Sequence, residues 1–267
     1  MDSPFSVKWT PLFHNSILEK LKIHKKEALL RIRNITNGRT MPEIINVSIG
    51  SAKKMEAAIL FFDLREFTAI TSKLSNEAVL YILNAIIPQM IYAVKHWKGE
   101  IEKNTGDGIM AIFGTETRDS FHIARDVIEA SMAMRYIMVN DIQPKLIAEN
   151  LPVLNFRIGI DMQEVLISRI GIKENSFLTV IGDAANRASK LQDLAETDGI
   201  CIGHNIYNNL HPFLHEHCRE GHNKDWNWHY PDSQMPYKFF QFDINYSEPR
   251  EWLKIVLNLK KQIRERS

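Results

Sequence analysis

The segment AAILFFDLREFT (57–68) begins with a short apolar run, rich in large side chains, that ends at the carboxylate Asp63. A continuous apolar run of this length is typical of a strand that is buried on both faces. The segment therefore predicts a central strand that delivers Asp63 at its C-terminal end. The alternative from the same pattern is that Asp63 only caps the helix that follows.

The neighbouring segments alternate between helical and strand patterns. Ser75 and Asn76 are cap residues for a long helix that reaches about Lys95. Residues 99–112 predict two short strands around the turn Asn104–Gly108, and a helix returns at about 119–140.

The second half of the chain continues the same mixture. Residues 154–171 alternate well enough for two strands joined near Met162 and Gln163, and 179–195 predict a short strand that passes into a helix. Further strands are expected at 200–202 and 237–242. This order predicts an α+β fold, a ferredoxin-like antiparallel sheet with helices packed on one face.

Composition limits the class of protein. The 267 residues are 45% hydrophobic and 24% charged, which is typical of a globular chain with a packed core. The formal net charge of +1 excludes the broad basic surface of a nucleic-acid binder. Two cysteines and the absence of a signal-peptide pattern favour the cytoplasm. The longest apolar stretch, 78–94, is interrupted by polar residues and predicts no stable membrane insertion.

The chain divides into three expected parts. An N-terminal helical extension (1–50) contains an amphipathic basic helix at 15–33, a core domain occupies 51–245, and a basic helix (251–264) lies in the C-terminal part, 246–267. A charged helix face is usually solvated, although binding to a membrane or a partner is an alternative for the first helix.

Two carboxylates can converge in this fold. Asp63 ends the first strand of the core, and Asp107 lies in the Gly-flanked turn of the central hairpin. Neighbouring carboxylates suit a pair of Mg²⁺ ions that clamp the attacking and leaving oxygens of a phosphoryl transfer. The alternative is that Asp107 is only a turn residue.

Four motifs carry a resemblance to a known family. FFDLREFT (61–68), EKNTGDGIMAIFG (102–114), FRIGID (156–161) and TVIGDAANRASKL (179–191) resemble, in order and spacing, the signature blocks of class III nucleotide cyclase catalytic domains. The similarity extends over about 55–242. A diguanylate cyclase, which also builds on a ferredoxin-like plan, would need a different hairpin motif.

The resemblance implies a metal site and a reaction. Asp63, the main-chain carbonyl of Leu64 and Asp107 match the positions that hold two Mg²⁺ or Mn²⁺ ions. The ions lower the pKa of the ribose 3′-hydroxyl and neutralise the triphosphate as diphosphate leaves.

Other matching positions are implied to contact the substrate. Asn186 matches the asparagine that orients the ribose, and Lys190 stands where an arginine usually contacts the α-phosphate. Lysine keeps the charge but loses the planar fork of arginine. Arg187 is a possible substitute, but it points about 100° away around the helix. Lys238 resembles the lysine that holds the terminal phosphates, and Lys173 falls near a second basic position.

Two further departures affect loops. Glu66 stands where glycine is usual, and Asp161-Met162-Gln163 replaces a usual His-x-Gly turn. We expect them to alter loop geometry and to leave the metal site intact.

The base-selecting positions of the family correspond to Lys103 and Thr179. These side chains can satisfy uracil, cytosine or adenine by hydrogen bonding. The chain shows a cyclase core without a recognisable sensor, membrane or receiver domain, which is similar to the free-standing uridylate and cytidylate cyclases of bacterial Pycsar antiphage systems. A pyrimidine triphosphate is therefore favoured over ATP, with UTP placed before CTP, and the cyclic nucleotide is expected to activate a separate effector protein. An adenylate cyclase and a catalytically inactive pseudo-cyclase are the alternatives.

The family also implies a homodimer with shared active sites. One chain supplies the two aspartates, and the other supplies the base-binding residues together with Asn186 and Lys190. A monomer is then expected to be inactive.

Histidines gather near the C-terminal end of the core. Their spacing lacks the paired ligands of a zinc site, so we interpret them as solvated loop residues. The group comprises His211, His215, His217, His222 and the neighbouring Cys218.

Overall fold

The computed structural model describes residues 35–37, 48–114, 119–173, 175–231 and 233–243. The helices expected at 15–33 and 251–264 lie outside these residues. Within the described parts of the chain, nine strands form one sheet in the order β3-β4-β2-β5-β7-β9-β8, with β1 and β6 paired at its side to β2 and β5. The strands are β1 (Ile35–Asn37), β2 (Ala52–Leu64), β3 (Glu100–Asn104), β4 (Gly108–Phe113), β5 (Phe156–Ile172), β6 (Asn175–Ile181), β7 (Gly199–Gly203), β8 (Cys218–Glu220) and β9 (Phe239–Phe242).

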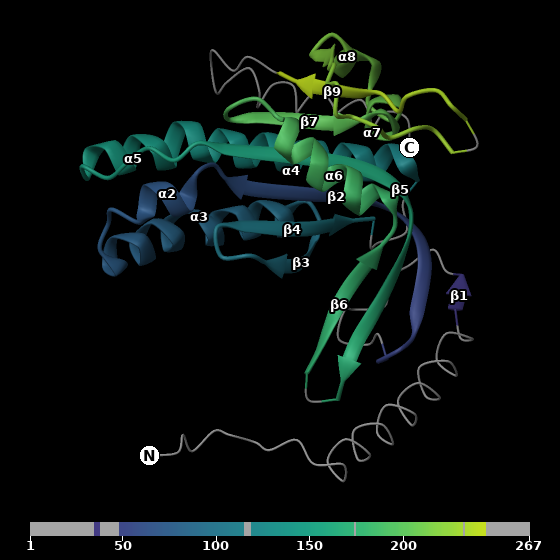
Figure 1. The fold of residues 1–267 in the computed structure, drawn as a ribbon, viewed down its shortest axis with the longest axis horizontal. Helices are drawn as coiled ribbons and strands as arrows, with labels where there is room; N and C mark the ends of the chain where they lie inside the picture. The colour runs from purple at the N-terminus through teal and green to yellow at the C-terminus, as the bar shows by residue number, and fades with distance from the viewer. Residues whose placement is uncertain (1–34, 38–47, 115–118, 174, 232, 244–267) are drawn as a thin grey trace, which may run out of the picture.

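Helices cover both faces of the sheet (Figure 1). They are α2 (Phe67–Thr71), α3 (Asn76–His96), α4 (Ser120–Ile137), the π-helical turn η2 (Met138–Ile142), α5 (Gln143–Ala148), α6 (Asp183–Leu194), α7 (His204–Asn208) and α8 (Pro212–His215). The α+β prediction is confirmed. So is the start of α3, because the Ser75 hydroxyl accepts a hydrogen bond from the N–H of Ala78 at 3.2 Å.

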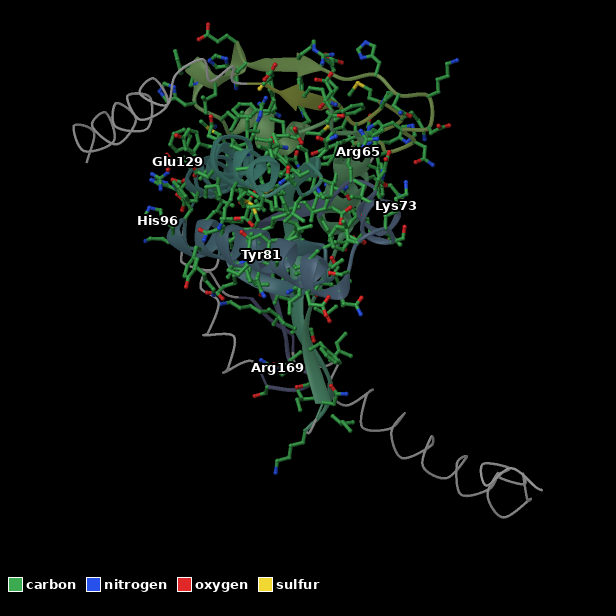
Figure 2. The ribbon with its side chains drawn as sticks, turned by 90° about the vertical axis from the view of Figure 1, so that its left-hand side faces the viewer. Arg65, Lys73, Tyr81, His96, Glu129 and Arg169 are labelled. Atoms are coloured by element: carbon green, nitrogen blue, oxygen red, sulfur yellow. The ribbon has the colours of Figure 1, made fainter. Side chains whose placement is uncertain are left out.

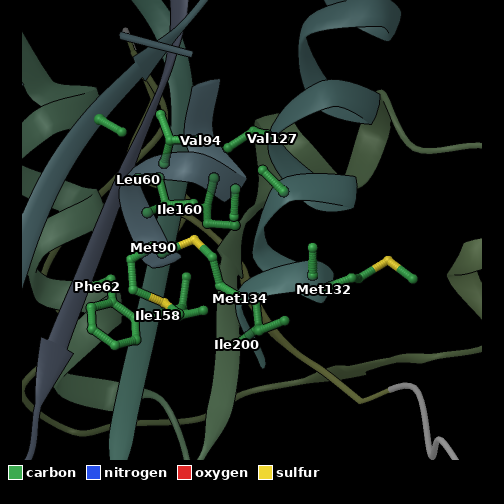
Figure 3. Packing of buried hydrophobic residues seen from close by; sticks show 14 of the residues in the cluster. Leu60, Phe62, Met90, Val94, Val127, Met132, Met134, Ile158, Ile160 and Ile200 are labelled. Carbon is green, nitrogen blue, oxygen red and sulfur yellow. The ribbon is translucent and has the colours of Figure 1, made fainter. Parts of the chain in front are cut away.

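Strand β2 divides the core because its successive side chains point to opposite faces. Leu60 and Phe62 pack against α3 and α4 in the larger apolar cluster (Figure 3). Ala57 and Ile59 belong to the second cluster, which includes Ala188 of α6. The expectation that all helices share one face is therefore wrong, since α6 lies on the other face from α3 and α4.

Strand β5 differs from its prediction. Residues 156–172 form one strand that pairs with β2 without interruption from Phe156 to Ser168. Met162 and Gln163 do not form a turn, because neither residue has the backbone freedom or the local hydrogen-bonding side chain of a turn residue. The chain turns only after Ile172, where the hairpin to β6 begins; Gly171, with φ +136°, still pairs with Ser176 of β6.

The sheet is not purely antiparallel. Strand β7 runs parallel to β5, and α6 lies in the crossover between them. Gly159 of β5 permits the close packing of this helix, because a Cβ there would lie 2.2 Å from the carbonyl oxygen of Ala188 and 2.1 Å from the N–H nitrogen of Gln192. The position of α6 against the sheet thus depends on a residue without a side chain.

The outer half of the β5–β6 hairpin projects from the body of the protein, together with the start of β2 (Figure 1). Arg169 marks this projection in the side view (Figure 2). Four large apolar side chains on it are 49–65% exposed: Ile170, Ile172, Phe177 and Ile181. We call this group the hairpin patch.

Helix α3 is long and apolar enough to cross a membrane by length and composition alone. Its Ile82, Ile86 and Met90 side chains are fully buried in the large core cluster. This burial fits the predicted core helix.

Candidate active site

Asp63 and Asp107 lie side by side at one end of the sheet. Asp63 of β2 is paired with Gly108, the first residue of β4 and the neighbour of Asp107. The N–H of Leu64 donates to the carbonyl oxygen of Asp107 at 3.3 Å. A Cβ on Gly108 would lie 2.9 Å from Oδ1 of Asp63 and 2.5 Å from the carbonyl oxygen of Phe62. Glycine at this position therefore leaves room for the Asp63 carboxylate, and the predicted convergence is confirmed.

The alternative that Asp63 caps a helix is wrong. The next helix, α2, starts at Phe67 and its cap position is Glu66. Glu66 adopts φ 54° and ψ 23°, the left-handed conformation that glycine accepts without a steric penalty. The chain thus keeps a glycine-like turn directly after the Asp63 strand, although the residue is a glutamate.

The charge environment of Asp63 favours a cation. Burial raises the pKa of Asp63 to about 6, and the nearby Asp107 and Asp193 carboxylates raise it as well. The Arg157 guanidinium acts in the opposite direction. Half-buried carboxylates that repel one another gain from a divalent ion placed between them.

The donor set fits Mg²⁺ or Mn²⁺ better than a protein-enclosed metal. In the described part of the chain, no group of three or more His, Cys, Asp or Glu side chains is arranged to hold a metal ion. Two carboxylates and a main-chain carbonyl leave several coordination positions for water and phosphate oxygens. Mg²⁺ is bound in this way at phosphoryl-transfer sites.

Arg157 and Asp193 were missed by the sequence analysis. Arg157 of β5 is paired with Asp63 in the β2–β5 register, and its Nη1 donates to the carbonyl oxygen of Asp193 at 2.7 Å. Its Nε is buried without a hydrogen-bond partner among the described residues. Once the pairing of the first and third motifs is known, the position of Arg157 in FRIGID places it beside Asp63.

Lys103 and Thr179 come from strands that are in contact, β3 and β6. Lys103 is exposed, with its Nζ 3.7 Å from a carboxylate oxygen of the buried Glu102 side chain. Thr179 is half-buried and pairs with Ser168 of β5. One chain therefore gathers the strands that carry the two candidate base-binding residues.

Asn186 and Lys190 share the exposed face of α6. Lys190 is 65% exposed, and its Nζ lies 3.5 Å from Oδ2 of Asp193. Arg187, between them, is 1% exposed and points into the protein. Arg187 is thus unable to substitute for Lys190 at a substrate.

The two other candidate lysines lie apart in one chain. Lys238 precedes β9 and its Nζ donates to Glu220 at 3.0 Å. Lys173 is exposed in the turn of the projecting hairpin (Figure 1). The structure does not bring Lys173 to Lys238 within a single chain.

The histidines near the end of the core have local roles. The His211 ring nitrogen accepts a hydrogen bond from the N–H of Phe213 at 3.3 Å and caps α8. His215 stacks on Tyr207 with ring centroids 4.3 Å apart. These two side chains stabilise the loop between β7 and β8.

Several known proteins that are similar to this chain are named cyclases. Residues 49–225 match the family model of the adenylate and guanylate cyclase catalytic domain. A cytidylate cyclase of Staphylococcus aureus is 31% identical over 150 residues, which cover 55% of this chain and 36% of that protein. An adenylate cyclase of Anabaena cylindrica is 29% identical over 172 residues, which cover 62% of this chain and 33% of that protein. The chain thus spans about a third of the length of these relatives.

A uridylate cyclase of Rhodovulum sp. (strain MB263) is 27% identical over 179 residues, which cover 63% of this chain and 72% of that protein. Among solved structures, the adenylyl cyclase CyaB of P. aeruginosa matches with a TM-score of 0.63 and 24% identity, over 73% of this chain and 96% of that chain. This structural match shows the fold.

Proposed function

Because this chain belongs to the adenylate and guanylate cyclase catalytic domain family, we propose that it is a metal-dependent nucleotide cyclase. It converts a nucleoside triphosphate to the 3′,5′-cyclic monophosphate and diphosphate. The observation that carries the proposal is the juxtaposition of Asp63 and Asp107, with the raised pKa of Asp63. A carboxylate pair with open coordination positions suits phosphoryl transfer, in which positioning and charge compensation supply most of the catalysis.

The roles of the chain's own residues follow from their places. Asp63, Asp107 and the carbonyl of Leu64 hold two divalent cations, Mg²⁺ or Mn²⁺, at the end of β2. When bound, these ions lower the pKa of the ribose 3′-hydroxyl and offset the charge of the triphosphate. Asn186 orients the ribose, while Lys190 balances charge at the α-phosphate.

The reaction needs no covalent enzyme intermediate. The 3′-oxygen loses its proton to solvent and forms a bond to the α-phosphorus, and the bond from that phosphorus to the bridging oxygen breaks as diphosphate leaves. Lys238 holds the terminal phosphates, and its ammonium exchanges the Glu220 carboxylate for phosphate oxygens. Lys173 acts at the same phosphates, but from a partner chain because it lies on the projecting hairpin.

The active form is a homodimer with two shared sites. The hairpin patch exposes four large apolar side chains on a projecting element, and burial of such a surface stabilises association. One chain contributes the aspartates and the other contributes Lys103, Thr179 and the exposed face of α6. We assign this catalytic domain to residues 51–245.

The substrate base is a pyrimidine, with UTP favoured over CTP. Lys103 and Thr179 offer one cationic donor and one hydroxyl, which can pair with the adjacent donor and acceptor groups of uracil, cytosine or adenine. Relatives named cytidylate and uridylate cyclases support a pyrimidine base, and their names do not distinguish UTP from CTP. We place the protein in the cytoplasm, in a Pycsar-like antiphage system where the cyclic nucleotide activates a separate effector.

Two other functions have specific support. A relative named adenylate cyclase has similar identity, so ATP with cyclic AMP as product is the alternative substrate. Lys190 stands where the family usually has arginine and lacks the planar fork of that side chain, which favours a pseudo-cyclase that binds a nucleotide without turnover.

The experiment is to incubate the purified protein with Mn²⁺ and with ATP, GTP, CTP or UTP separately, and to identify products by mass spectrometry. Cyclic UMP or cyclic CMP supports the pyrimidine proposal, and cyclic AMP supports the alternative. If no triphosphate yields a cyclic product while the protein binds it, the remaining explanations are a pseudo-cyclase and an enzyme whose activator is missing from the assay.

A further inference from the structure

Helix α6 contains a buried cation that the proposed reaction does not use. Arg187 is 1% exposed, and it lies between two exposed residues of the same helix, Asn186 and Lys190. An arginine is almost never fully buried unless it is paired. The role of Arg187 must therefore be inferred from the residues that it contacts.

Arg187 is held on two sides. Its Nε contacts the carboxylate of Asp161, and its Nη2 donates to Oε1 of Gln163 at 2.6 Å. Both partners are residues of β5. On the other side, the guanidinium carbon lies 4.4 Å from the centre of the Tyr237 ring and 5.7 Å from that of Trp228. The guanidinium is thus enclosed by a carboxylate, an amide and two aromatic rings.

Asp161 is equally constrained. Its exposed fraction is 0%, and its Oδ1 accepts a hydrogen bond from the Tyr237 hydroxyl at 2.8 Å. Burial and the Asp161 charge raise the pKa of Tyr237, so the hydroxyl keeps the proton that it donates. A Cβ on Gly203 would lie 2.2 Å from Oδ1 of Asp161, so the glycine makes room for the carboxylate. The departure from the usual turn at Asp161 is part of this cluster.

The cluster connects two candidate phosphate contacts. Arg187 is adjacent to Asn186 and three residues before Lys190 on α6, and Tyr237 is adjacent to Lys238. The main chain at Tyr237 is fixed as well, because its N–H donates to the carbonyl of Trp228 at 2.7 Å and its carbonyl accepts from Nε1 of Trp226 at 2.5 Å. One buried group therefore bonds both α6 and the segment that carries Lys238 to β5.

Stability alone does not require such a cluster. A buried ion pair loses much of its Coulombic gain to desolvation, and well-packed apolar residues often replace it without loss of stability. The planar fork of arginine, in contrast, fixes direction as well as distance. The contacts of Arg187 therefore fix the orientation of α6, and with it the direction in which the exposed side chains of α6 point toward a substrate.

We propose that Arg187 is a positioning residue: with Asp161 and Tyr237 it fixes α6 and Lys238 as one unit that meets both ends of a single bound triphosphate. The inference rests on the proposed function for the identity of the ligand. The geometry of the unit itself rests on the contacts given above.

The test compares single variants with a charge-balanced double variant in the full chain. Asp161→Asn and Arg187→Met each leave an unpaired buried partner, and both are expected to lower Tm. The double variant Asp161→Asn with Arg187→Met leaves no unpaired buried charge, since Asp183, the other partner of Arg187, is exposed to solvent; it is expected to recover most of the loss of Tm. Its kcat is expected to stay about ten- to a hundredfold below that of the original protein, because the exposed face of α6 is no longer oriented.

The control is Arg135→Met on α4. Arg135 pairs with Asp243 at 3.1 Å. Helix α4 packs on the other face of the sheet from α6, so kcat is expected to be unchanged. Arg187→Lys keeps the charge without the fork and is expected to restore Tm more than kcat. If the double variant recovers Tm and kcat together, the cluster is only structural and the proposal is overturned. A single variant with normal kcat overturns it as well.

A second measurement separates this proposal from the proposed function. The dissociation constant of a 3′-deoxynucleoside triphosphate, which lacks the attacking hydroxyl, is measured for the original protein and the double variant. If the original protein makes no cyclic product, the proposed function fails, and about tenfold weaker binding by the double variant still supports the positioning role. Equal affinity overturns the positioning role, and no binding to the original protein overturns both.

Discussion

The N–H of Leu64 donates a hydrogen bond to the carbonyl oxygen of Asp107 at 3.3 Å, and this contact joins the end of β2 to the turn before β4. It places the residue after Asp63 against the main chain of Asp107. Both carboxylates thus come from elements that the sheet holds rigidly, which is the arrangement that a shared pair of cations requires.

Asp63→Asn and Asp107→Asn are each expected to lower cyclic nucleotide formation by about a hundredfold or more, because a neutral amide binds a divalent cation far more weakly. The amide has nearly the same shape, so Tm is expected to change little. The assay is product formation with Mn²⁺, with Asp225→Asn, an exposed loop substitution, as control. Retained activity in either site variant would contradict the two-metal assignment.

The pKa of Asp63 predicts how stability depends on pH without metal. The folded carboxyl has a pKa of about 6 against an ordinary value of 3.8, so between these values the folded protein binds more protons than the unfolded chain. The free energy of unfolding is therefore expected to fall as pH rises from about 4 to about 6. Half-exposure of the group makes the effect modest.

The measurement is Tm in EDTA over that pH window, and the matched variant is Asp63→Asn. The variant is expected to show a flatter profile, and added Mg²⁺ is expected to raise Tm more at high pH than at low pH. A profile that is the same in both proteins would show that Asp63 is not the titrating group.

The convergence of Asp63 and Asp107 could be predicted because local signals in the sequence place each aspartate at the end of a strand or in a turn. A short apolar run ends at the first aspartate, and glycines on both sides of the second demand a tight turn. The sequence could not show that β5 is a single strand. Apolar and polar residues alternate through Met162 and Gln163 in either case, and only the pairing with β2 shows that the strand continues there.

Neither the sheet face that α6 covers nor the ion pair between Asp161 and Arg187 could be predicted from the sequence. Helical periodicity identifies the buried stripe of α6, which includes Ala188, but not the sheet face against which it packs. Asp161 and Arg187 are 26 residues apart, and their ion pair depends on the close approach that Gly159 allows. Tertiary packing decided these features.

Glu66→Gly is expected to stabilise the protein by about 0.5–1 kcal/mol. The left-handed conformation at φ 54° is unfavourable for glutamate, and its relief exceeds the entropy that glycine loses on folding. Tm by calorimetry checks this. Glu77→Gly, in the first turn of α3, is the control and is expected to lower Tm. A fall in Tm for Glu66→Gly would mean that its side chain stabilises the turn.

Phe177→Glu with Ile181→Glu is expected to give a folded monomer without cyclase activity. The two substitutions place charges in the hairpin patch, and a charge buried at an interface without a partner is costly. Sedimentation or light scattering measures the mass, and Phe213→Glu on α8, 45% exposed, is the control. An active monomer would exclude shared sites.

Mixing two inactive variants tests which residues share a site. Asp63→Ala removes a metal ligand and Asn186→Ala removes the ribose contact, so each homodimer has two defective sites. If one chain supplies the aspartates and the other supplies α6, a heterodimer has one intact site and one with both defects. Random exchange makes half of the dimers mixed, so about a quarter of the original activity is expected. Exchange is verified with a tag on one variant, and inactive mixed dimers would place Asp63 and Asn186 in the same site of one chain.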